Sequence, residues 1–319
     1  MKGNLIMTVA EMADRDKWLE LRKKGIGGSE AAIIVGMNPW KSAFQLWMEK
    51  TGQTEPEDIS NNEYVKWGTK LEQLVAEAFC EETGKQVRRC GMMADEEYPY
   101  MLASVDRLVV GENAGLECKT ANGFKAKEWE DDKVPDAYYI QCQWYMMVTG
   151  AEKWYIACLI GGNHFVWKEI ARNDGDIEAI RMAAVDFWSK VQTGVMPAVD
   201  GSADCSSALA DRFKDAAPGS ECQLPSTAAG WLTRYDELKA TEKEVEKQLM
   251  QCKNELALLL GNCEKGYCGE RFVRWVSVKG RTTVDSKRLK AELPDVYGRY
   301  AKVGQPSRRF DISTLKEDK

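Results

Sequence analysis

Hydrophobic positions in the first 84 residues follow helical spacing in two segments. In KSAFQLWMEKTG, Ser42 can cap the start of a helix and Gly52 follows its end. The longer segment NNEYVKWGTKLEQLVAEAFCEETG repeats this arrangement between Asn62 and Gly84. Over residues 86–119 the spacing shortens to that of strands, in the runs QVRRCGMM, MLASVDRLVV and GLECKT. The pattern predicts two helices followed by consecutive strands.

A second series of elements follows. PDAYYIQCQWYMMVTG has helical spacing, with Pro135 at its entrance and Gly150 at its exit. KWYIACLI and NHFVWKEI read as two strands joined by a turn at residues 161–163, and residues 174–193 read as a helix. This order predicts an α/β or α+β sandwich over residues 1–200.

The last third of the chain has a different pattern. Residues 201–229 are rich in Ser, Ala, Gly, Asp and Pro, a composition that predicts a linker. Residues 230–319 predict an appendage of helices and strands. It includes a strand after Gly269 and a short helix from Asp285 to Glu292. The first appendage helix carries an apolar stripe with steps of four and three, which suits either a partner helix or burial against its own domain. The stripe comprises Trp231, Tyr235, Leu238, Val245, Leu249, Cys252, Leu256 and Leu259, with Glu242 as its polar member.

Charge is distributed unevenly along the chain. The formal net charge is −6, yet residues 263–319 contain 14 Lys and Arg against 8 Asp and Glu, so the balance is +6 there and −12 in the first 262 residues. The basic segment is either a surface for phosphate backbones or an acidic protein, or a solvated surface without a partner. The net negative charge of the first 262 residues, taken alone, would argue against a nucleic-acid-binding protein.

Composition also restricts the chemistry. Ten cysteines lie at irregular intervals without a CxxC pair, which indicates reduced packing residues. His164 is the single histidine, so zinc sites and Ser-His-Asp triads are disfavoured, and chemistry has to rely on carboxylates and lysines. No segment has the pattern of a signal peptide or a membrane span, so we expect a cytoplasmic protein without a membrane partner.

The strongest candidate site lies in ASVDR and GLECKT. On a strand alternate residues share a face, so Glu117 and Lys119 point the same way and Cys118 points the other way. If Asp106 lies on a neighbouring strand, its carboxylate and that of Glu117 can share Mg²⁺ or Mn²⁺, which prefer oxygen ligands. A cross-strand ion pair without catalysis would explain the same residues.

Two further polar residues support a site. Glu72 lies on the apolar face of its predicted helix, where a carboxylate has to be satisfied by a metal, or by Lys119 or Arg107 without a metal. Gln141 shares a helical face with two tyrosines and can be a core amide, or can hold a metal-bound water or the lysine.

The stretch RKKGIGGSEAA combines cations with three glycines. It lacks the GxxxxGK[ST] order of a P-loop, and no strand is predicted before it. The glycines predict a tight turn after which Ser29 opens a helix that, with Arg22, faces an anion. A helix cap without a ligand is the alternative.

Five motifs in order, RKKGIGGSE, WGTKLE, ASVDR, LECKT and QCQWYMMVTG, resemble the phage lambda-exonuclease family and most closely its YqaJ-like recombinase branch. The similarity covers Trp18 to Asp200. It implies an α/β, restriction-endonuclease-like core of the PD-(D/E)xK class, with a central mixed sheet flanked by helices, and Mg²⁺-dependent hydrolysis of DNA. Val105 stands where proline is usual in the class motif.

The resemblance also assigns residues. It implies that Asp106, Glu117 and the Cys118 carbonyl ligate metal, with Glu72 as a further ligand or a water-mediated support. Lys119 would activate the nucleophilic water and Gln141 would assist. The positions that match 5′-phosphate ligands in the family are Arg22, Ser29 and Ser104.

In activity, the resemblance implies a 5′-to-3′ exonuclease that acts on linear double-stranded DNA with a 5′ phosphate and leaves 3′ overhangs for phage recombination. It further implies a trimer, a single-strand annealing protein as partner and a phage or prophage origin in a bacterial host. Two alternatives remain open: an endonuclease or single-strand nuclease of the same fold, and a catalytically inactive protein that binds DNA ends or another partner.

Overall fold

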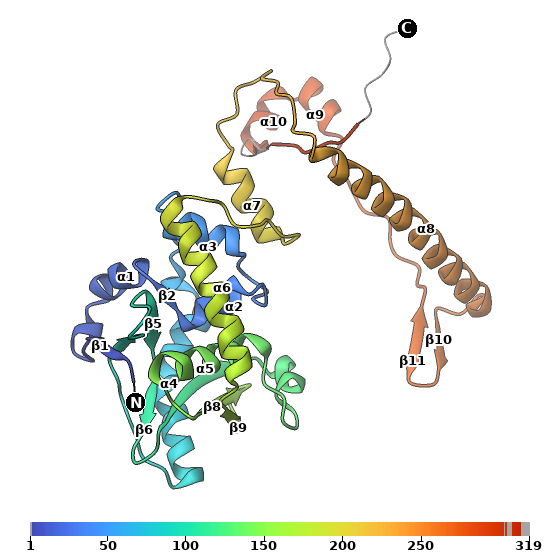
Figure 1. Ribbon diagram of the computed structural model, residues 1–319. Coiled ribbons are helices and arrows are strands. Elements are labelled where there is room, and N and C mark those ends of the chain that lie inside the picture. The colour runs from blue at the N-terminus through green and yellow to red at the C-terminus, as the bar shows by residue number, and fades with distance from the viewer. Residues whose placement is uncertain (1, 303, 305–307, 314–319) are drawn as a thin grey trace. The chain divides into compact units, whose positions relative to one another are not determined.

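The chain forms two compact units, Met1–Lys214 and Asp215–Lys319. A computed structural model describes residues 2–302, 304 and 308–313 (Figure 1). Among these described residues no helix combines the length and the apolar character needed to cross a membrane. The predicted appendage, residues 230–319, lies within the second unit, which begins at Asp215.

The first unit is built around a five-stranded mixed sheet in the order β3-β6-β7-β8-β9. The central pair, β7 and β8, is parallel, and the remaining pairs are antiparallel. The prediction of an α/β fold with a mixed sheet is therefore confirmed. The strands are β3 (Val87–Arg88), β6 (Arg107–Val109), β7 (Ala114–Ala121), β8 (Lys153–Ile160) and β9 (His164–Ala171).

Two helices cover the faces of this sheet. Helix α4 (Glu63–Thr83) packs Phe79 against Leu116 and its neighbours on one face, and α5 (Asp136–Thr149) lies against Trp154 on the other. Burial of these large apolar side chains supplies the main stabilisation of the unit. The sheet is thus held between α4 and α5 (Figure 1).

A second, four-stranded sheet has the order β1-β4-β5-β2 and was not predicted. The run MLASVDRLVV, predicted as one strand, is two strands in different sheets, because the chain leaves this sheet after Ser104 and enters the five-stranded sheet at Arg107. Asp106 therefore lies between the two sheets. The strands are β1 (Asn4–Met7), β2 (Ile26–Gly27), β4 (Met92–Ala94) and β5 (Met101–Ser104).

Helix boundaries agree closely with the sequence pattern. Ser42 and Asn62 cap the N-termini of α3 and α4, and Gly84 and Gly150 end α4 and α5 in the left-handed conformation. These caps are local, which is why the sequence predicts them. The other helices of the unit are α1 (Arg15–Lys23), α2 (Gly28–Ile34), α3 (Ala43–Lys50), α6 (Asp174–Thr193) and α7 (Ala203–Arg212), with short 3₁₀ turns at Glu11–Ala13, Ile59–Asn61 and Gly123–Trp129.

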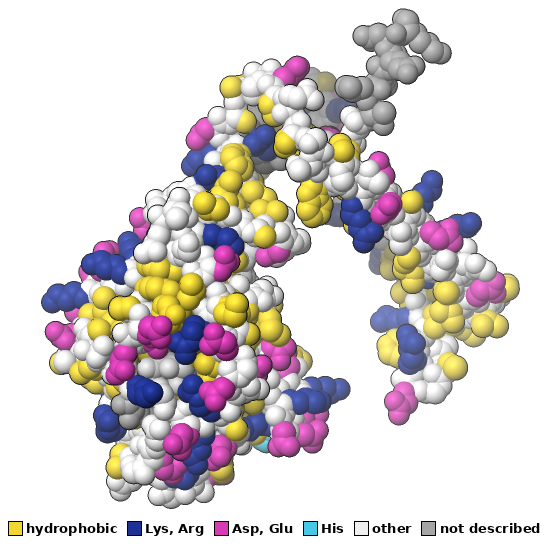
Figure 2. All heavy atoms as spheres, in the orientation of Figure 1, with side chains coloured by type: hydrophobic (Ala, Val, Ile, Leu, Met, Phe, Trp, Pro, Cys, Tyr) yellow, Lys and Arg dark blue, Asp and Glu magenta, His cyan; other side chains and the backbone are white. Residues whose placement is uncertain are grey.

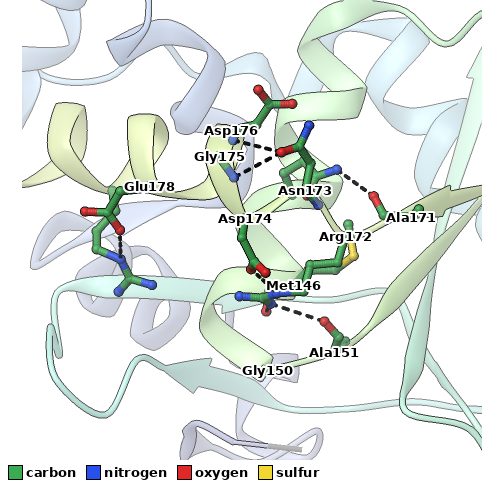
Figure 3. Close-up of polar contacts among 12 residues, drawn as sticks. Met146, Gly150, Ala151, Ala171, Arg172, Asn173, Asp174, Gly175, Asp176 and Glu178 are labelled. Atoms are coloured by element: carbon green, nitrogen blue, oxygen red, sulfur yellow. Dashed lines mark hydrogen bonds and ion pairs between the residues drawn. The ribbon is translucent and has the colours of Figure 1, made fainter.

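The start of α6 is tied to the end of α5 (Figure 3). The Asn173 side chain accepts hydrogen bonds from the amides of Gly175 and Asp176 and so caps α6. The neighbouring Arg172 donates from Nη1 to the carbonyl of Met146 at 2.7 Å, near the end of α5. A cation at a helix C-terminus is favourable, so this pair of residues fixes both helix ends.

The segment 201–229, predicted as a linker, begins with a packed helix. Residues Cys205 and Ala208 of α7 are buried, and the Asp204 carboxylate accepts hydrogen bonds from the amide and the hydroxyl of Ser42, both at 2.7 Å. The first unit therefore extends to Lys214. The small side chains of this segment, which led to the linker prediction, instead allow α7 to pack closely on α3.

The second unit contains one long helix and a small α/β part. The coiled-coil-type stripe lies on α8 (Ala228–Leu260), and all eight of its apolar members are exposed. The predicted helix from Asp285 is α9, capped by that residue, and Pro294 both ends it and starts the next helix. The remaining elements are β10 (Lys265–Cys268), β11 (Arg271–Arg274), α9 (Ser286–Glu292) and α10 (Pro294–Tyr300).

Candidate active site

A cavity of about 620 Å³ in the first unit brings the predicted site residues together. Lys119 and Cys118 do not line it, but Lys119 is bonded to two residues that do. Residues from four helices and strands of both sheets form its wall. The predicted residues in the wall are Arg22, Ser29, Glu72, Ser104, Asp106, Glu117 and Gln141.

Strand β7 positions the carboxylate and the amine as the alternation rule predicts. Lys119 Nζ lies 2.5 Å from Glu117 Oε1. The intervening Cys118 side chain packs on the opposite face, against the hydrophobic cluster under α4. The negative charges of Glu117 and Asp106 raise the pKa of Lys119 although burial opposes this, so the amine is an ammonium ion at neutral pH.

Gln141 connects this pair to the neighbouring sheet. Its Oε1 accepts a hydrogen bond from Lys119 at 3.0 Å, and its Nε2 donates to Glu117 at 2.9 Å and to the Tyr145 hydroxyl at 2.8 Å. That hydroxyl donates to the carbonyl of Ser104 at 3.0 Å. Of the predicted roles for Gln141, the contact with the lysine is observed.

Asp106 is held beside this network by the backbone. Its Oδ2 accepts a hydrogen bond from the Cys118 amide at 2.7 Å. Burial, together with the negative charge of Glu117, raises the pKa of Asp106 well above its usual range. Burial likewise raises the pKa of Glu117, and the nearby Lys119 counteracts part of this effect. A buried and a half-buried carboxylate with raised pKa values favour the binding of a cation between them.

The donor set suits a hard divalent ion. Within the described part of the chain no hydrogen-bond donor reaches the buried Glu117 Oε2, which leaves a carboxylate oxygen free to coordinate. No cluster of three His, Cys, Asp or Glu side chains with ligand geometry occurs among the described residues. Two carboxylates, a backbone carbonyl and water match the mixed coordination of Mg²⁺ better than a closed all-protein site.

Glu72 is engaged by an arginine. Its Oε1 lies 2.5 Å from Arg107 Nη1, and Arg107 Nη2 donates to Gln73 at 2.9 Å. The Glu72 side chain is partly exposed and the Arg107 side chain is buried. Of the partners predicted for this carboxylate, Arg107 is the one observed.

The predicted anion-binding residues form a second group along the cavity. Arg22 Nη2 donates to the Ser29 hydroxyl at 3.4 Å, and the Trp18 indole donates to the Ser104 hydroxyl at 3.3 Å. The Arg22 guanidinium stacks over the Trp18 ring at 5.1 Å. Trp18 was not predicted, because its contact with Ser104 spans 86 residues.

The turn before Ser29 differs from the prediction. Helix α2 starts at Gly28 with Gly27 as its N-cap, so Ser29 lies in the first turn rather than opening the helix, and the short strand β2 precedes it. The glycines are needed for space: a Cβ on Gly27 would lie 2.9 Å from Arg22 Nη2, and a Cβ on Gly28 would lie 2.5 Å from the Tyr145 ring.

Glu30 and Lys50 are site residues that the sequence reasoning missed. Glu30 Oε2 accepts a hydrogen bond from the Gly27 amide at 2.7 Å, and its Oε1 lies 2.9 Å from both Arg22 Nη2 and Lys50 Nζ. The spacing of Glu30 after Gly27, three residues, is that of a capping box and could have indicated the first contact. Nothing local indicates Lys50.

Comparison with known proteins gives a consistent assignment. Residues 17–152 match the YqaJ-like viral recombinase domain. The chain is 41% identical over 318 residues to the uncharacterized protein YqaJ of Bacillus subtilis (strain 168), and the match covers 98% of each chain. A shorter stretch of 71 residues is 32% identical to protein D345L of African swine fever virus (strain Badajoz 1971 Vero-adapted), covering 21% of this chain and 20% of that protein.

Solved structures show the same fold. An alkaline exonuclease (LHK-Exo) from Laribacter hongkongensis superposes with a TM-score of 0.50 at 21% identity, covering 56% of this chain and 94% of that one. Its complex with dAMP gives a TM-score of 0.51 at 23% identity with the same coverage. The first unit therefore has the alkaline exonuclease fold, to which the C-terminal elements are added. By its full-length similarity to YqaJ and its matching domain, the chain belongs to the YqaJ-like viral recombinase family.

Proposed function

We propose that the protein is a Mg²⁺-dependent deoxyribonuclease that degrades linear double-stranded DNA from 5′-phosphorylated ends. The observation that carries this proposal is one cavity lined both by the carboxylates linked to Lys119 and by the group around Arg22. A bound terminal phosphate and a scissile phosphodiester would then lie in the same space. The likeness of the fold to an alkaline exonuclease supports the reaction class.

The divalent ion would be held by Asp106, Glu117 and the Cys118 carbonyl, with Glu72 supporting the site through Arg107. Bound Mg²⁺, or Mn²⁺ in its place, would polarise the scissile phosphate and lower the pKa of coordinated water. Glu117 Oε2, which has no hydrogen-bond partner among the described residues, and the raised pKa values of Asp106 and Glu117 support this assignment.

Lys119 orients the attacking water and stabilises negative charge on the phosphate. Its amine, 2.5 Å from Glu117, can hold the attacking water and donate to the phosphate. Gln141 holds the amine in place through its Oε1. The Tyr145 hydroxyl accepts a hydrogen bond from Gln141 and donates one to the Ser104 carbonyl. The position of Lys119 is therefore linked to that of Ser104, a proposed ligand of the DNA end.

Arg22, Ser29 and Ser104 would bind the terminal 5′ phosphate. A guanidinium fork offers paired donors to phosphate oxygens, and two hydroxyls add further donors. LHK-Exo, which has the same fold, has been crystallised with dAMP, a nucleoside monophosphate. Binding of the end would select linear DNA and set the 5′-to-3′ direction.

Two partner assignments also follow from the family resemblance. We propose that the protein forms a trimer around DNA and that a phage single-strand annealing protein takes up the 3′ overhang. A ring would confine positive potential to its channel, which reconciles an acidic chain with DNA binding. Sedimentation of the purified protein tests the trimer.

The activity is tested with three substrates in Mg²⁺: a linear duplex with 5′ phosphates, the same duplex with 5′ hydroxyls and a closed circle. We expect rapid digestion of the first, slower digestion of the second and none of the third. Digestion of the circle at a comparable rate would indicate an endonuclease, and a linear single strand degraded faster than the duplex would indicate a single-strand nuclease. No digestion of any substrate would indicate a DNA-binding protein without catalysis.

A further inference from the structure

The β10–β11 hairpin of the second unit has two chemically different faces. Tyr267 pairs with Phe272 across the hairpin, and Lys265 pairs with Arg274. Because side chains alternate along a strand and directly opposed residues share a face, these four side chains lie on one face. We call this set the hairpin tetrad.

The opposite face of the hairpin packs on the end of α8. A Cβ on Gly266 would lie 2.9 Å from Leu260 Cδ1, and the Leu260 side chain is only 9% exposed. Val273, which pairs with Gly266, is half-buried. The hairpin is therefore anchored through this face, and the tetrad points to solvent.

The tetrad presents a pair of aromatic rings beside a pair of cations. Tyr267 is 74% exposed and Phe272 is 58% exposed, with their ring centroids 6.4 Å apart. Lys265 Nζ lies 4.7 Å and 4.4 Å from the two centroids. Figure 2 shows basic and hydrophobic side chains side by side over the hairpin. Exposed rings of this kind contribute little to the fold, and contiguous exposed apolar groups mark interaction sites.

We propose that the hairpin tetrad binds single-stranded DNA. Sites for single strands combine aromatic rings on which bases stack with cations that pair with phosphates, and the tetrad supplies both within one small face. Residues 263–302 carry 10 Lys and Arg against 5 Asp and Glu, so the surrounding charge favours a polyanion. A duplex keeps its bases stacked inside, and an acidic peptide has no bases, so neither uses the two rings.

The tetrad shares no residue with the cavity in the first unit, and its binding of DNA goes beyond the proposed nuclease activity. A 5′-to-3′ digestion leaves a single strand, which is the class of ligand that the tetrad would take. The binding itself needs no cleavage, so it is tested in a chelator, where its failure and the failure of the nuclease proposal are distinct results.

The test uses the full chain and fluorescence anisotropy of a labelled oligothymidylate in EDTA. We expect the double variant Tyr267→Ala/Phe272→Ala to raise the Kd by about tenfold or more, since stacking on each ring contributes substantially to binding. The matched control is Tyr300→Ala, which removes a tyrosine of the same unit that is 79% exposed, and its Kd should stay unchanged. A double variant that binds like the wild type overturns the proposal.

Two further measurements separate stacking from charge. An abasic deoxyribose-phosphate oligomer of equal length should bind the wild type about tenfold more weakly than oligothymidylate, and Tyr267→Leu/Phe272→Leu, which keeps apolar side chains and the fold, should lose this preference. The variant Lys265→Ala/Arg274→Ala should reduce the slope of log Kd against log salt by about 1.4, as expected for two phosphate contacts on a single strand. Equal binding of the abasic oligomer, or equal competition by polyglutamate, would show a surface for acidic partners and overturn the assignment.

Discussion

Arg22, which lines the cavity, forms an ion pair with Glu30 at 2.9 Å, and the same Glu30 oxygen lies 2.9 Å from Lys50. One carboxylate therefore faces two cations and leaves a net positive charge at the position proposed for the terminal phosphate. Burial of the carboxylate is tolerated because both cations and the Gly27 amide satisfy it. The pair fixes the guanidinium before any ligand binds.

This arrangement predicts a pH-dependent contribution to stability. The charges of Arg22 and Lys50 outweigh burial and lower the pKa of Glu30 from its usual 4.5 to about 2. A carboxylate whose pKa is lower in the folded than in the unfolded protein stabilises the fold at pH values above its unfolded pKa. This stabilisation is lost as the pH falls toward the folded pKa, here about 2. We expect Glu30→Gln to unfold more easily than the wild type by roughly 3 kcal/mol at pH 7, with the difference shrinking between pH 4.5 and 2.

Urea unfolding at several pH values measures this difference. The exposed Glu20→Gln serves as control, because Glu20 pairs only with a solvated lysine at 3.3 Å and should contribute little at any pH. A Glu30→Gln difference that is constant down to pH 2 would mean that the carboxylate is not charged in the folded protein.

Removal of the Lys119 amine should abolish most turnover. Lys119→Ala should lower kcat about 10²- to 10⁴-fold, the range typical of a positioned proton-transfer or charge-stabilising group. DNA binding, measured by anisotropy in EDTA, should be nearly unchanged. The control Lys127→Ala removes an exposed lysine. Equal rates for Lys119→Ala and the wild type would support the reading as a catalytically inactive binding protein.

Arg22→Lys should impair recognition of the DNA end more than catalysis. A single ammonium cannot reproduce the paired donors of the guanidinium. We expect the preference in kcat/KM for 5′-phosphorylated over 5′-hydroxyl duplexes to fall about tenfold, while the rate on hydroxyl ends changes little. A preference that survives in Arg22→Lys would place the phosphate elsewhere.

The close contact between Gly28 and Tyr145 predicts a steric effect. In Gly28→Ala the new Cβ would lie 2.5 Å from the ring, so Tyr145 has to move, and its hydroxyl would lose Gln141 and Ser104. We expect a loss of activity of about a hundredfold, in line with small misplacements near a reacting centre. Gly230→Ala, a helical glycine with open space around its Cβ position, should keep full activity.

Divalent ions should stabilise the wild-type fold and not a variant without the carboxylates. A ligand that binds only the folded state raises Tm with its concentration. We expect MgCl₂ to raise Tm for the wild type and to have no such effect on Asp106→Asn/Glu117→Gln. This readout does not depend on DNA cleavage. Equal shifts in both proteins would place the ion outside the proposed ligands.

The sequence predicts elements whose signals are local. Asn62 and Gly84 mark both ends of α4, and the alternation along β7 places Glu117 beside Lys119 because each signal lies within a few residues. Contacts between distant segments leave no such trace. Lys50 contacts Arg22 across 28 residues of sequence, and Trp18 contacts Ser104 across 86 residues. Only the folded structure reveals these two contacts. The split of MLASVDRLVV is a third example, since an apolar run does not show that its halves pair with different sheets.

The passage of the chain between the two sheets has a geometric consequence. Only Val105 and Asp106 separate Ser104, beside the proposed binding site for the DNA end, from β6, which pairs with the strand carrying Glu117 and Lys119. The three residue steps from Ser104 to Arg107 span at most about 11 Å, so the two halves of the site stay close together. Each added residue would therefore loosen the link between the end-binding residues and the carboxylates, even if both strands kept their pairing.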